Sequence, residues 1–219
     1  MIAETLISDC IVPLRTSDTG EEALQVFNDF FIRHLPVVED KKLIGLISEE
    51  DLLDYDIEAT ISSYNLPPPA TFITTTDHIY EVLRRMAEYQ LSVIPVLDDK
   101  NNYVGLISQE DLLRQFASMG SFSEPGSIIV LETIKSDYSL AEFARIVESE
   151  NAAVLCSFIT STMESHKIEV SLKVNLQNLQ PLLATFERFG YQIKASFSED
   201  EYINSLKERY DSLMLYLNV

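Results

Sequence analysis

A nine-residue run occurs twice in the sequence and decides the fold: GLISEEDLL at residues 45–53 and GLISQEDLL at 105–113. The two copies differ at one position and begin 60 residues apart. Upstream, Pro36 and Pro95 correspond at a spacing of 59, so the second copy has one additional residue in its turn DDKNN, 98–102. A repeat tolerates an insertion in a turn. The sequence therefore predicts two copies of one structural unit.

Each copy shows the same succession of patterns, from which we expect a strand, a helix, two strands and a second helix. Apolar residues recur at helical spacing within 23–31 and 79–87. Asp18 and Asp77 stand where the N-caps of these helices are expected. Two short apolar runs around a charged turn then predict a β-hairpin in each copy.

The sequence also predicts the first strand and the second helix of the repeats, and the boundaries between them. We expect the first strand near 11–14 in the first copy and near 72–74 in the second, and a second helix from Ser48 in the first copy and from Ser108 in the second. Pro67–Pro69 cannot continue a helix and marks a boundary between the copies. The Gly/Ser/Pro-rich stretch 118–126 predicts a linker after the second copy.

The last third of the sequence has a different pattern, which predicts the order βαββαβ of a ferredoxin-like arrangement. Ser139 and Glu142 have the spacing of a capping box before its first helix, and Gly190 stops its second helix. A final helix is expected at the C-terminus. Its apolar face would comprise Ile203, Leu206, Tyr210, Leu213 and Leu217.

The composition is strongly acidic, with 16 basic and 35 acidic residues and a formal net charge of −19. Nucleic acids and anionic membranes are bound through Lys and Arg, so neither is expected as a partner. The sequence has no basic-then-apolar leader and no run of about 18 apolar residues, which predicts a cytoplasmic protein. Cys10 and Cys156 lack metal or disulfide spacing, and we expect both to be small buried residues.

Residues 1–116 resemble a tandem pair of CBS domains, the Bateman module, through RHLPVVEDKKLIGLISEEDLL and SVIPVLDDKNNYVGLISQEDLL. The resemblance implies CBS repeats at 1–60 and 61–118 with pseudo-twofold symmetry. Residues 126–197 resemble an ACT-type regulatory domain in element order, and 198–219 would form the final helix. The expected fold class is thus α/β (α+β), with two β-α-β-β-α repeats and a βαββαβ domain. This layout is similar to small accessory proteins of the acetoin-utilisation type.

The CBS resemblance implies an adenosine-class ligand (AMP, ADP, ATP or S-adenosylmethionine) in the cleft between the repeats, and no required cofactor. The Ser and Asp of the repeated run would reach ribose and phosphate, and the segment before each hairpin would contact the base. The implied ligand-binding residues are Arg33, His34, Leu35, Pro36, Ser48 and Asp51 in the first repeat, and Ser92, Val93, Ile94, Pro95, Ser108 and Asp111 in the second. The ACT resemblance implies an effector turn at Ser136, Asp137, Tyr138 and Ser139, in which no glycine allows close backbone approach.

Two features of the repeated run bear on the ligand. Glu50 and Glu110 precede the two aspartates, where phosphate-binding members of the family often have a basic residue. Carboxylates repel phosphate, so a nucleoside or a cationic ligand fits better than a polyphosphate. The spacing Ser–x–x–Asp is also that of a capping box, so capping alone and capping with ribose contact are both open interpretations.

The sequence shows no arrangement typical of catalysis. No P-loop, GxGxxG motif or Ser/His/Asp constellation is present. The histidines are also separated: position 34 lies in the first repeat, 78 in the second, and 166 in the last third of the sequence. We therefore expect no catalytic or metal site, and instead a regulatory homodimer that signals to a partner protein by a conformational shift. The alternatives are an unliganded dimerisation scaffold and the regulatory subunit of an enzyme.

Overall fold

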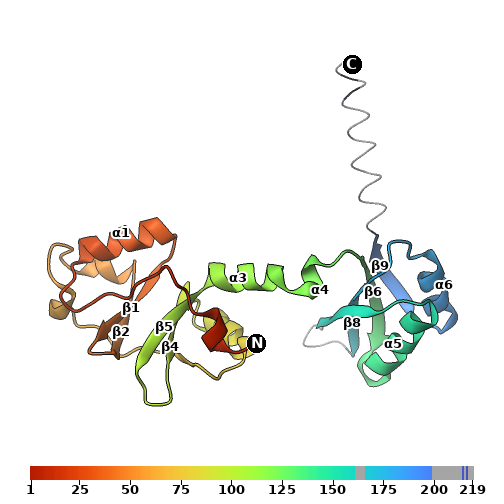
Figure 1. Cartoon of the computed structure of the whole chain (residues 1–219), viewed down its shortest axis with the longest axis horizontal. Helices are drawn as coiled ribbons and strands as arrows, with labels where there is room; N and C mark the ends of the chain where they lie inside the picture. Colours follow the sequence, from red (N-terminus) through yellow and green to blue (C-terminus); the bar gives the residue numbers. More distant parts are fainter. Residues whose placement is uncertain (161–165, 199–213, 215, 217–219) are drawn as a thin grey trace. The chain divides into compact units, whose positions relative to one another are not determined.

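The computed structural model describes residues 1–160, 166–198, 214 and 216. The chain divides into two units, 1–117 and 118–219, whose elements are labelled in Figure 1. The predicted C-terminal helix lies outside the described residues, apart from the positions 214 and 216.

The first unit contains the two repeats, and their helices and strands occur in matching order. The first repeat has a 3-10 helix Ala3–Leu6, α1 (Gly20–Phe30), β1 (His34–Glu39), β2 (Lys42–Ser48) and the 3-10 helix Asp51–Asp54. The 3-10 helix Ile61–Ser63 lies at the start of the second repeat. The second repeat has β3 (Ile73–Thr74), α2 (Ile79–Glu88), β4 (Val93–Leu97), β5 (Tyr103–Ser108) and α3 (Gln109–Ser118).

Both predicted hairpins are confirmed. β1 pairs with β2 in antiparallel fashion with Val37 opposite Gly45, and β4 pairs with β5 in the same way with Val96 opposite Gly105. In each hairpin the register shifts directly after the valine, so the two copies share even their irregularity. β3 extends the second sheet as a strand parallel to β4.

The segment that leads into each repeat packs on the other repeat. These leading segments are residues 1–8 and 60–67. Ile2 forms a β-bridge with His78, and Thr60 forms the equivalent bridge with Thr19. The repeats therefore exchange their leading segments, which ties them into one folded unit.

Glycine makes room for each exchanged segment. A Cβ added at Gly105 would lie 2.4 Å from Ile7 Cγ2, and one added at Gly45 would lie 3.2 Å from Leu66 Cβ. Ile7 and Leu66 occupy equivalent places in the two leading segments. The glycine of each repeated run thus serves close packing in a strand.

The two repeats share one hydrophobic core. Leu35, Val37 and Ile47 of the first repeat cluster with Val93 and Leu106 of the second, and all five are fully buried. Figure 1 shows the two hairpins side by side, in agreement with the contact between β1 and β4. The mixed α+β class and the paired repeats are as the sequence predicts.

The expected N-caps are wrong by one residue in both repeats. Thr19 caps α1 in a reciprocal capping box with Glu22, and His78 caps α2 by accepting from the Tyr80 N–H. Asp18 and Asp77 instead accept backbone N–H groups three residues upstream, at 2.8 Å in each case. The aspartates therefore stabilise the turn before each helix rather than its first turn.

The second helix of the first repeat is shorter than expected. Only the 3-10 helix Asp51–Asp54 forms, because the chain turns at Tyr55 to bring the second leading segment back onto the first repeat. The Tyr55 ring stacks on Tyr64 of that segment at a centroid distance of 4.2 Å. The expected strand at 11–14 is likewise reduced to a bridge from Leu14 to Val37. Proline at position 13 has no N–H to extend the ladder.

Three further expectations need correction. The helical spacing within 23–31 includes Phe31 on the apolar face, but Phe31 follows that helix with a left-handed backbone and is 94% exposed. Cys10 is exposed and Cys156 is half-buried, so neither is a core residue. The expected linker contains a helical turn, α4 (Gly120–Ser123).

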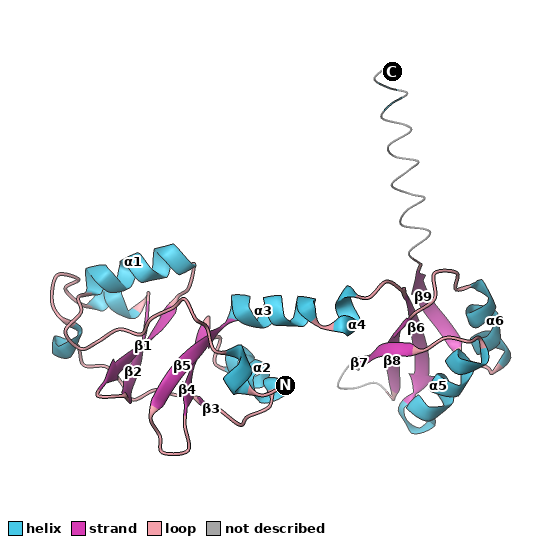
Figure 2. Cartoon of the chain, viewed as in Figure 1, coloured by secondary structure: helices cyan, strands magenta, loops and turns pink. Residues whose placement is uncertain are grey.

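The second unit has the predicted βαββαβ order. It comprises β6 (Ser127–Ile134), α5 (Leu140–Ser149), β7 (Val154–Thr160), β8 (Lys167–Val174), α6 (Gln180–Arg188) and β9 (Gln192–Phe197). The antiparallel sheet has the strand order β7-β8-β6-β9, which is ferredoxin-like, and Figure 2 shows α5 and α6 together against it. Phe143 of α5 and Phe186 of α6 are fully buried against the inward-facing residues of β6 and β8.

Candidate functional site

Ser48 and Asp51 close a reciprocal turn at the end of β2. Asp51 Oδ2 accepts from the Ser48 N–H and from the Ser48 hydroxyl, both at 2.7 Å. The Asp51 N–H donates in turn to Ser48 Oγ at 3.1 Å. The motif therefore has the reciprocal hydrogen bonds of a capping box, although the 3-10 helix itself begins only at Asp51 and Ser48 is not its N-cap. No partner for Asp51 Oδ1 is found among the described residues, and ribose contact stays a prediction.

The second copy repeats this turn. The Ser108 hydroxyl donates to Asp111 Oδ2 at 2.6 Å, and the Asp111 N–H donates to Ser108 Oγ at 3.0 Å. A further pair of equivalent bonds links each turn to the segment before its hairpin. The Glu49 N–H donates to the Arg33 carbonyl at 2.9 Å. In the second repeat the Gln109 N–H donates to the Ser92 carbonyl in the same way, at 3.0 Å.

The predicted base-contacting segments of the two repeats meet each other. The Arg33 N–H donates to Ser92 Oγ at 2.9 Å. The Ser92 N–H and hydroxyl both face His34 Nδ1, at 3.2 and 3.1 Å. This three-residue contact joins the repeats at the entrance to their hairpins.

The charge state of His34 follows from its surroundings. Burial lowers the pKa of His34 below its ordinary value, and Arg33 beside it lowers that pKa further. Asp51 and Glu50 oppose the shift without cancelling it. His34 is therefore neutral near pH 7, which suits an Nδ1 atom that accepts from a backbone N–H.

A cavity of about 340 Å³ lies beside this contact. Residues of both repeats line it: Arg33, His34, Ser48, Glu49, Glu50 and Leu53 from the first, and Tyr89 and Gln90 from the second. Three of the predicted ligand residues, Arg33, His34 and Ser48, thus come together. Leu35 and Pro36 are instead buried within β1, away from the lining.

Most of the predicted residues of the second repeat are buried. Ser92 and Ser108 are only 5% and 3% exposed, and Val93 and Ile94 are fully buried. Pro95 is buried within β4 with them. These five residues are therefore less accessible than Arg33, His34 and Ser48 of the first repeat, whereas Asp111 is partly exposed.

The two copies also differ in charge beside the repeated run. Arg114 pairs with Glu110 at 2.6 Å and with Asp111 at 3.5 Å. The residue equivalent to Arg114 in the first repeat is Asp54, so no cation occupies that place. Within the described residues neither Glu50 nor Asp54 has an ion-pair partner, and the open cleft keeps its negative charge.

Sequence reasoning missed the residues that the second repeat contributes to the cavity. Tyr89 and Gln90 end α2, and Gln90 has a left-handed backbone with φ of 52°. Phe31, its equivalent in the first repeat, has the same φ of 52°. Alignment of the two helix ends by the repeat spacing could have identified Gln90 as equivalent to Phe31. Only the folded structure shows that Gln90 and Ser48 line the same cavity.

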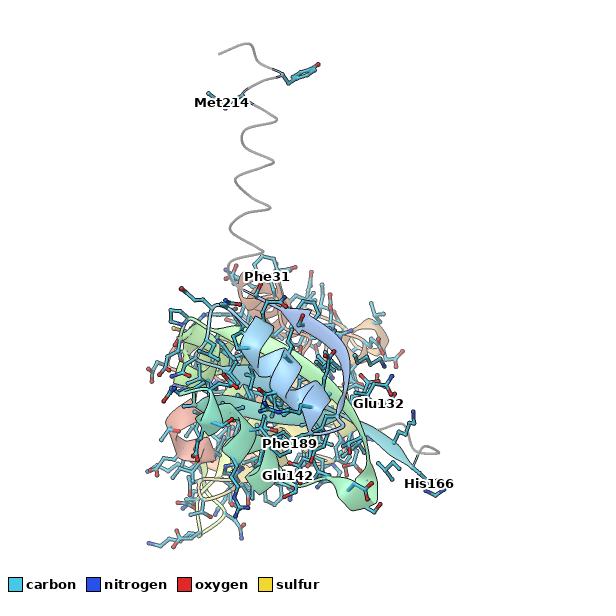
Figure 3. All side chains as sticks on the ribbon, turned by 90° about the vertical axis from the view of Figure 1, so that its right-hand side faces the viewer. Phe31, Glu132, Glu142, His166, Phe189 and Met214 are labelled. Carbon is cyan, nitrogen blue, oxygen red and sulfur yellow. The ribbon has the colours of Figure 1, made fainter. Side chains whose placement is uncertain are left out.

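The predicted effector turn of the second unit is formed in part. Lys135–Asp137 is a 3-10 turn, and Ser139 caps α5 by accepting from the Glu142 N–H at 3.3 Å. Two surface depressions, of about 460 and 560 Å³, lie on either side of Glu142 and Phe189, which Figure 3 labels. Ser139 lines one of them and Asp137 the other, whereas Ser136 and Tyr138 line neither.

The described residues contain neither a cluster of metal ligands nor a membrane-spanning helix. Across residues 1–160 and 166–198, no three His, Cys, Asp or Glu side chains converge as metal ligands would. Figure 3 shows His166 at the outer end of β8, in a different unit from His34 and His78. None of the helices in the described parts of the chain has the length and apolar character needed to cross a membrane.

The chain belongs to the CBS domain family, which matches residues 3–58 and 62–118, just over half of the sequence. Among curated relatives, Uncharacterized protein MJ0188 of Methanocaldococcus jannaschii is 30% identical over 105 residues, covering 48% of this chain and 40% of that protein. The magnesium transporter MgtE of Thermus thermophilus is 31% identical over 83 residues, covering 37% and 18%. The chain thus spans less than half the length of either relative.

Similar solved structures cover about half of this chain. A CBS domain pair/ACT domain protein from Thermotoga maritima is 24% identical with a TM-score of 0.46, covering 53% of this chain and 96% of that one.

Proposed function

We propose that this chain is a non-catalytic regulatory protein that binds one adenosine-class ligand in the cleft of its first repeat. The observation that carries the proposal is the cavity of about 340 Å³ lined by both repeats. A ligand there touches Ser48 on one side and Tyr89 on the other. Because it contacts both repeats, it favours one mutual orientation of them, and this population shift is the signal.

The charge of the cavity narrows the ligand class. Glu49 and Glu50 line it, and Arg33 is the single cation among its lining residues. Two unit charges about 5 Å apart near a protein surface interact by roughly 3 kcal/mol. A di- or triphosphate would meet this repulsion at each phosphate. A nucleoside or the sulfonium S-adenosylmethionine fits the cavity better than ADP or ATP, and AMP is intermediate.

The domain assignment that accompanies this function places the CBS repeats at 1–60 and 61–118, an ACT-like domain at 126–197 and a C-terminal helix at 198–219. In this layout, similar to the acetoin-utilisation type, the CBS pair senses the ligand. A partner protein in the cytoplasm receives the signal.

A second candidate is a dimerisation scaffold, and exposed apolar side chains favour dimerisation in either case. Phe31, after α1, is 94% exposed, and Leu113, on α3, is 72% exposed. A dimer interface that included these side chains would remove their apolar surface from water. We propose a homodimer in which the helical faces of the first unit take part.

Thermal unfolding with adenosine, S-adenosylmethionine, AMP and ATP tests the function. A ligand that binds only the folded protein stabilises it by about 2.7 kcal/mol at a hundred times its Kd. We expect adenosine and S-adenosylmethionine to raise the Tm and ATP to leave it unchanged. If none of the four ligands moves the Tm, the sensor proposal is wrong and the scaffold is favoured.

A matched pair of variants tests the location and the charge argument together. Glu50→Gln removes a carboxylate from the lining of the cavity, and Glu110→Gln removes the equivalent carboxylate beside the second copy of the turn. We expect the first variant to gain affinity for AMP and the second to bind like wild type. Equal responses of the two variants would contradict the placement of the ligand in the first repeat.

A further inference from the structure

The contact between His34 and Ser92 defines where the imidazole carries its proton. A backbone N–H can only donate, so His34 Nδ1, at 3.2 Å from the Ser92 nitrogen, must present a lone pair. Ser92 Oγ accepts from the Arg33 N–H at 2.9 Å, which leaves the hydroxyl proton to point at Nδ1, 3.1 Å away. A neutral imidazole with Nδ1 as acceptor carries its proton on Nε2.

Nε2–H is then the one polar group of the ring that is left for a ligand. His34 lines the cavity, and within the described residues no hydrogen bond to Nε2 is present. Burying an N–H without an acceptor costs free energy, so a ligand that fills the cavity is selected for an acceptor at this point.

We infer that Ser92 holds His34 as the Nε2–H tautomer and that this N–H selects ligands with an unprotonated ring nitrogen or a carbonyl oxygen facing it. Ser92 is a positioning residue from one repeat, and His34 is a specificity-determining residue from the other. The ligand half of this inference rests on the proposed function, whereas the tautomer half does not.

The arrangement also makes the contact between the repeats sensitive to acid. A second proton on His34 would sit on Nδ1, directly against the Ser92 N–H. The charged groups around the ring are Arg33, which disfavours that proton, and Asp51 and Glu50, which favour it. Protonation would therefore remove the Nδ1 lone pair that accepts from the Ser92 N–H and weaken the contact between the repeats, while the donor at Nε2 would remain.

Long-range proton–nitrogen NMR of the full chain at pH 7.5 tests the tautomer without any ligand. The chain has three histidines, and His34→Gln assigns the signal of interest. We expect the pattern of an Nε2–H imidazole for His34. A predominant Nδ1–H tautomer, or an averaged mixture like that of a free imidazole, would overturn the inference.

Adenosine and its 1-deaza, 3-deaza and 7-deaza analogues test the recognition. Each analogue lacks one ring nitrogen that can accept the Nε2–H. We expect one of the three to bind wild type about tenfold more weakly than adenosine, the worth of one hydrogen bond of about 1.4 kcal/mol. That difference should vanish in His34→Ala and persist in His34→Gln, whose amide keeps a donor. The exposed His166→Gln, in the other unit, should behave as wild type.

If all three analogues lose the same affinity in wild type and in His34→Ala, the recognition inference is wrong. If adenosine and its analogues fail to bind wild type at all, the proposed ligand class is wrong, and so is the inference that His34 Nε2–H recognises such a ligand. The NMR measurement then decides the tautomer alone, so the two failures are distinguishable.

Discussion

Gly105→Ala is predicted to destabilise the first unit by displacing the first leading segment. The new Cβ would lie 2.4 Å from Ile7 Cγ2, and the next two nearest atoms, at 3.6 and 3.7 Å, also belong to Ile7. The backbone at Gly105 does not have the positive φ that requires glycine, so the strain is steric. Ile7 cannot simply swing away, because the adjacent Ser8 N–H is held by the Leu106 carbonyl at 2.8 Å.

The size of the effect follows from two opposing terms. Overpacking a well-packed site costs about 1–3 kcal/mol. Replacing glycine by alanine restricts the unfolded chain and returns about 0.4–1 kcal/mol. The expected net loss in the free energy of unfolding is therefore about 1–2 kcal/mol. Urea titration followed by circular dichroism measures it, provided the m value is unchanged.

The duplicated fold supplies a matched control for this prediction. Ile7→Ala removes the clashing methyl groups, so Gly105→Ala should become neutral or stabilising in that background. Leu66→Ala makes the equivalent truncation in the other leading segment, beside Gly45, and should leave the cost of Gly105→Ala unchanged. If Ile7→Ala and Leu66→Ala alter that cost equally, the exchange of leading segments does not explain it.

Three further predictions concern single side chains. Tyr103→Phe should stabilise the protein by about 1 kcal/mol, because the buried Tyr103 hydroxyl has no hydrogen-bond partner among the described residues. Burial also raises the pKa of Tyr103, so the folded protein loses stability as the tyrosine of the unfolded chain ionises above pH ~10. The free energy of unfolding, measured against pH, should therefore fall less above that pH in the variant than in wild type. Phe186→Ala, in the core of the second unit, should cost about 3–5 kcal/mol by urea titration. Ser48→Ala and Ser108→Ala should each cost about 0.5–2 kcal/mol by the same measurement, since each removes the hydroxyl that accepts from an aspartate N–H.

What could be predicted from the sequence is what depends on neighbours along the chain. The hairpins follow from two apolar runs around a turn, and the turns at Ser48 and Ser108 follow from a serine three residues before an aspartate. The βαββαβ order of the second unit follows from alternating periods in the same way. In each case the residues that decide the structure lie within a few positions of one another.

What could not be predicted depends on contacts between distant segments. The exchange of leading segments places Ile7 on Gly105, and no local pattern signals such a contact. The N-caps moved from Asp18 to Thr19 because Asp18 binds the N–H of Arg15, a competition that the spacing alone cannot resolve. The cavity needed Tyr89, which reaches it only through the packing of the two repeats.

The repeated run identifies the family, but the residues around it differ between the two copies. Both copies form the same reciprocal turn between serine and aspartate. Arg33 of the first repeat corresponds to Ser92 of the second, and Ser92 Oγ accepts from the Arg33 N–H. Asp54 corresponds to Arg114, which pairs with Glu110 and Asp111, so the second copy has a cation where the first has a carboxylate. The two copies of one motif thus contribute differently to the cavity: the first repeat supplies six of its eight lining residues, and the second supplies the other two together with the hydroxyl and the N–H that hold the histidine in place.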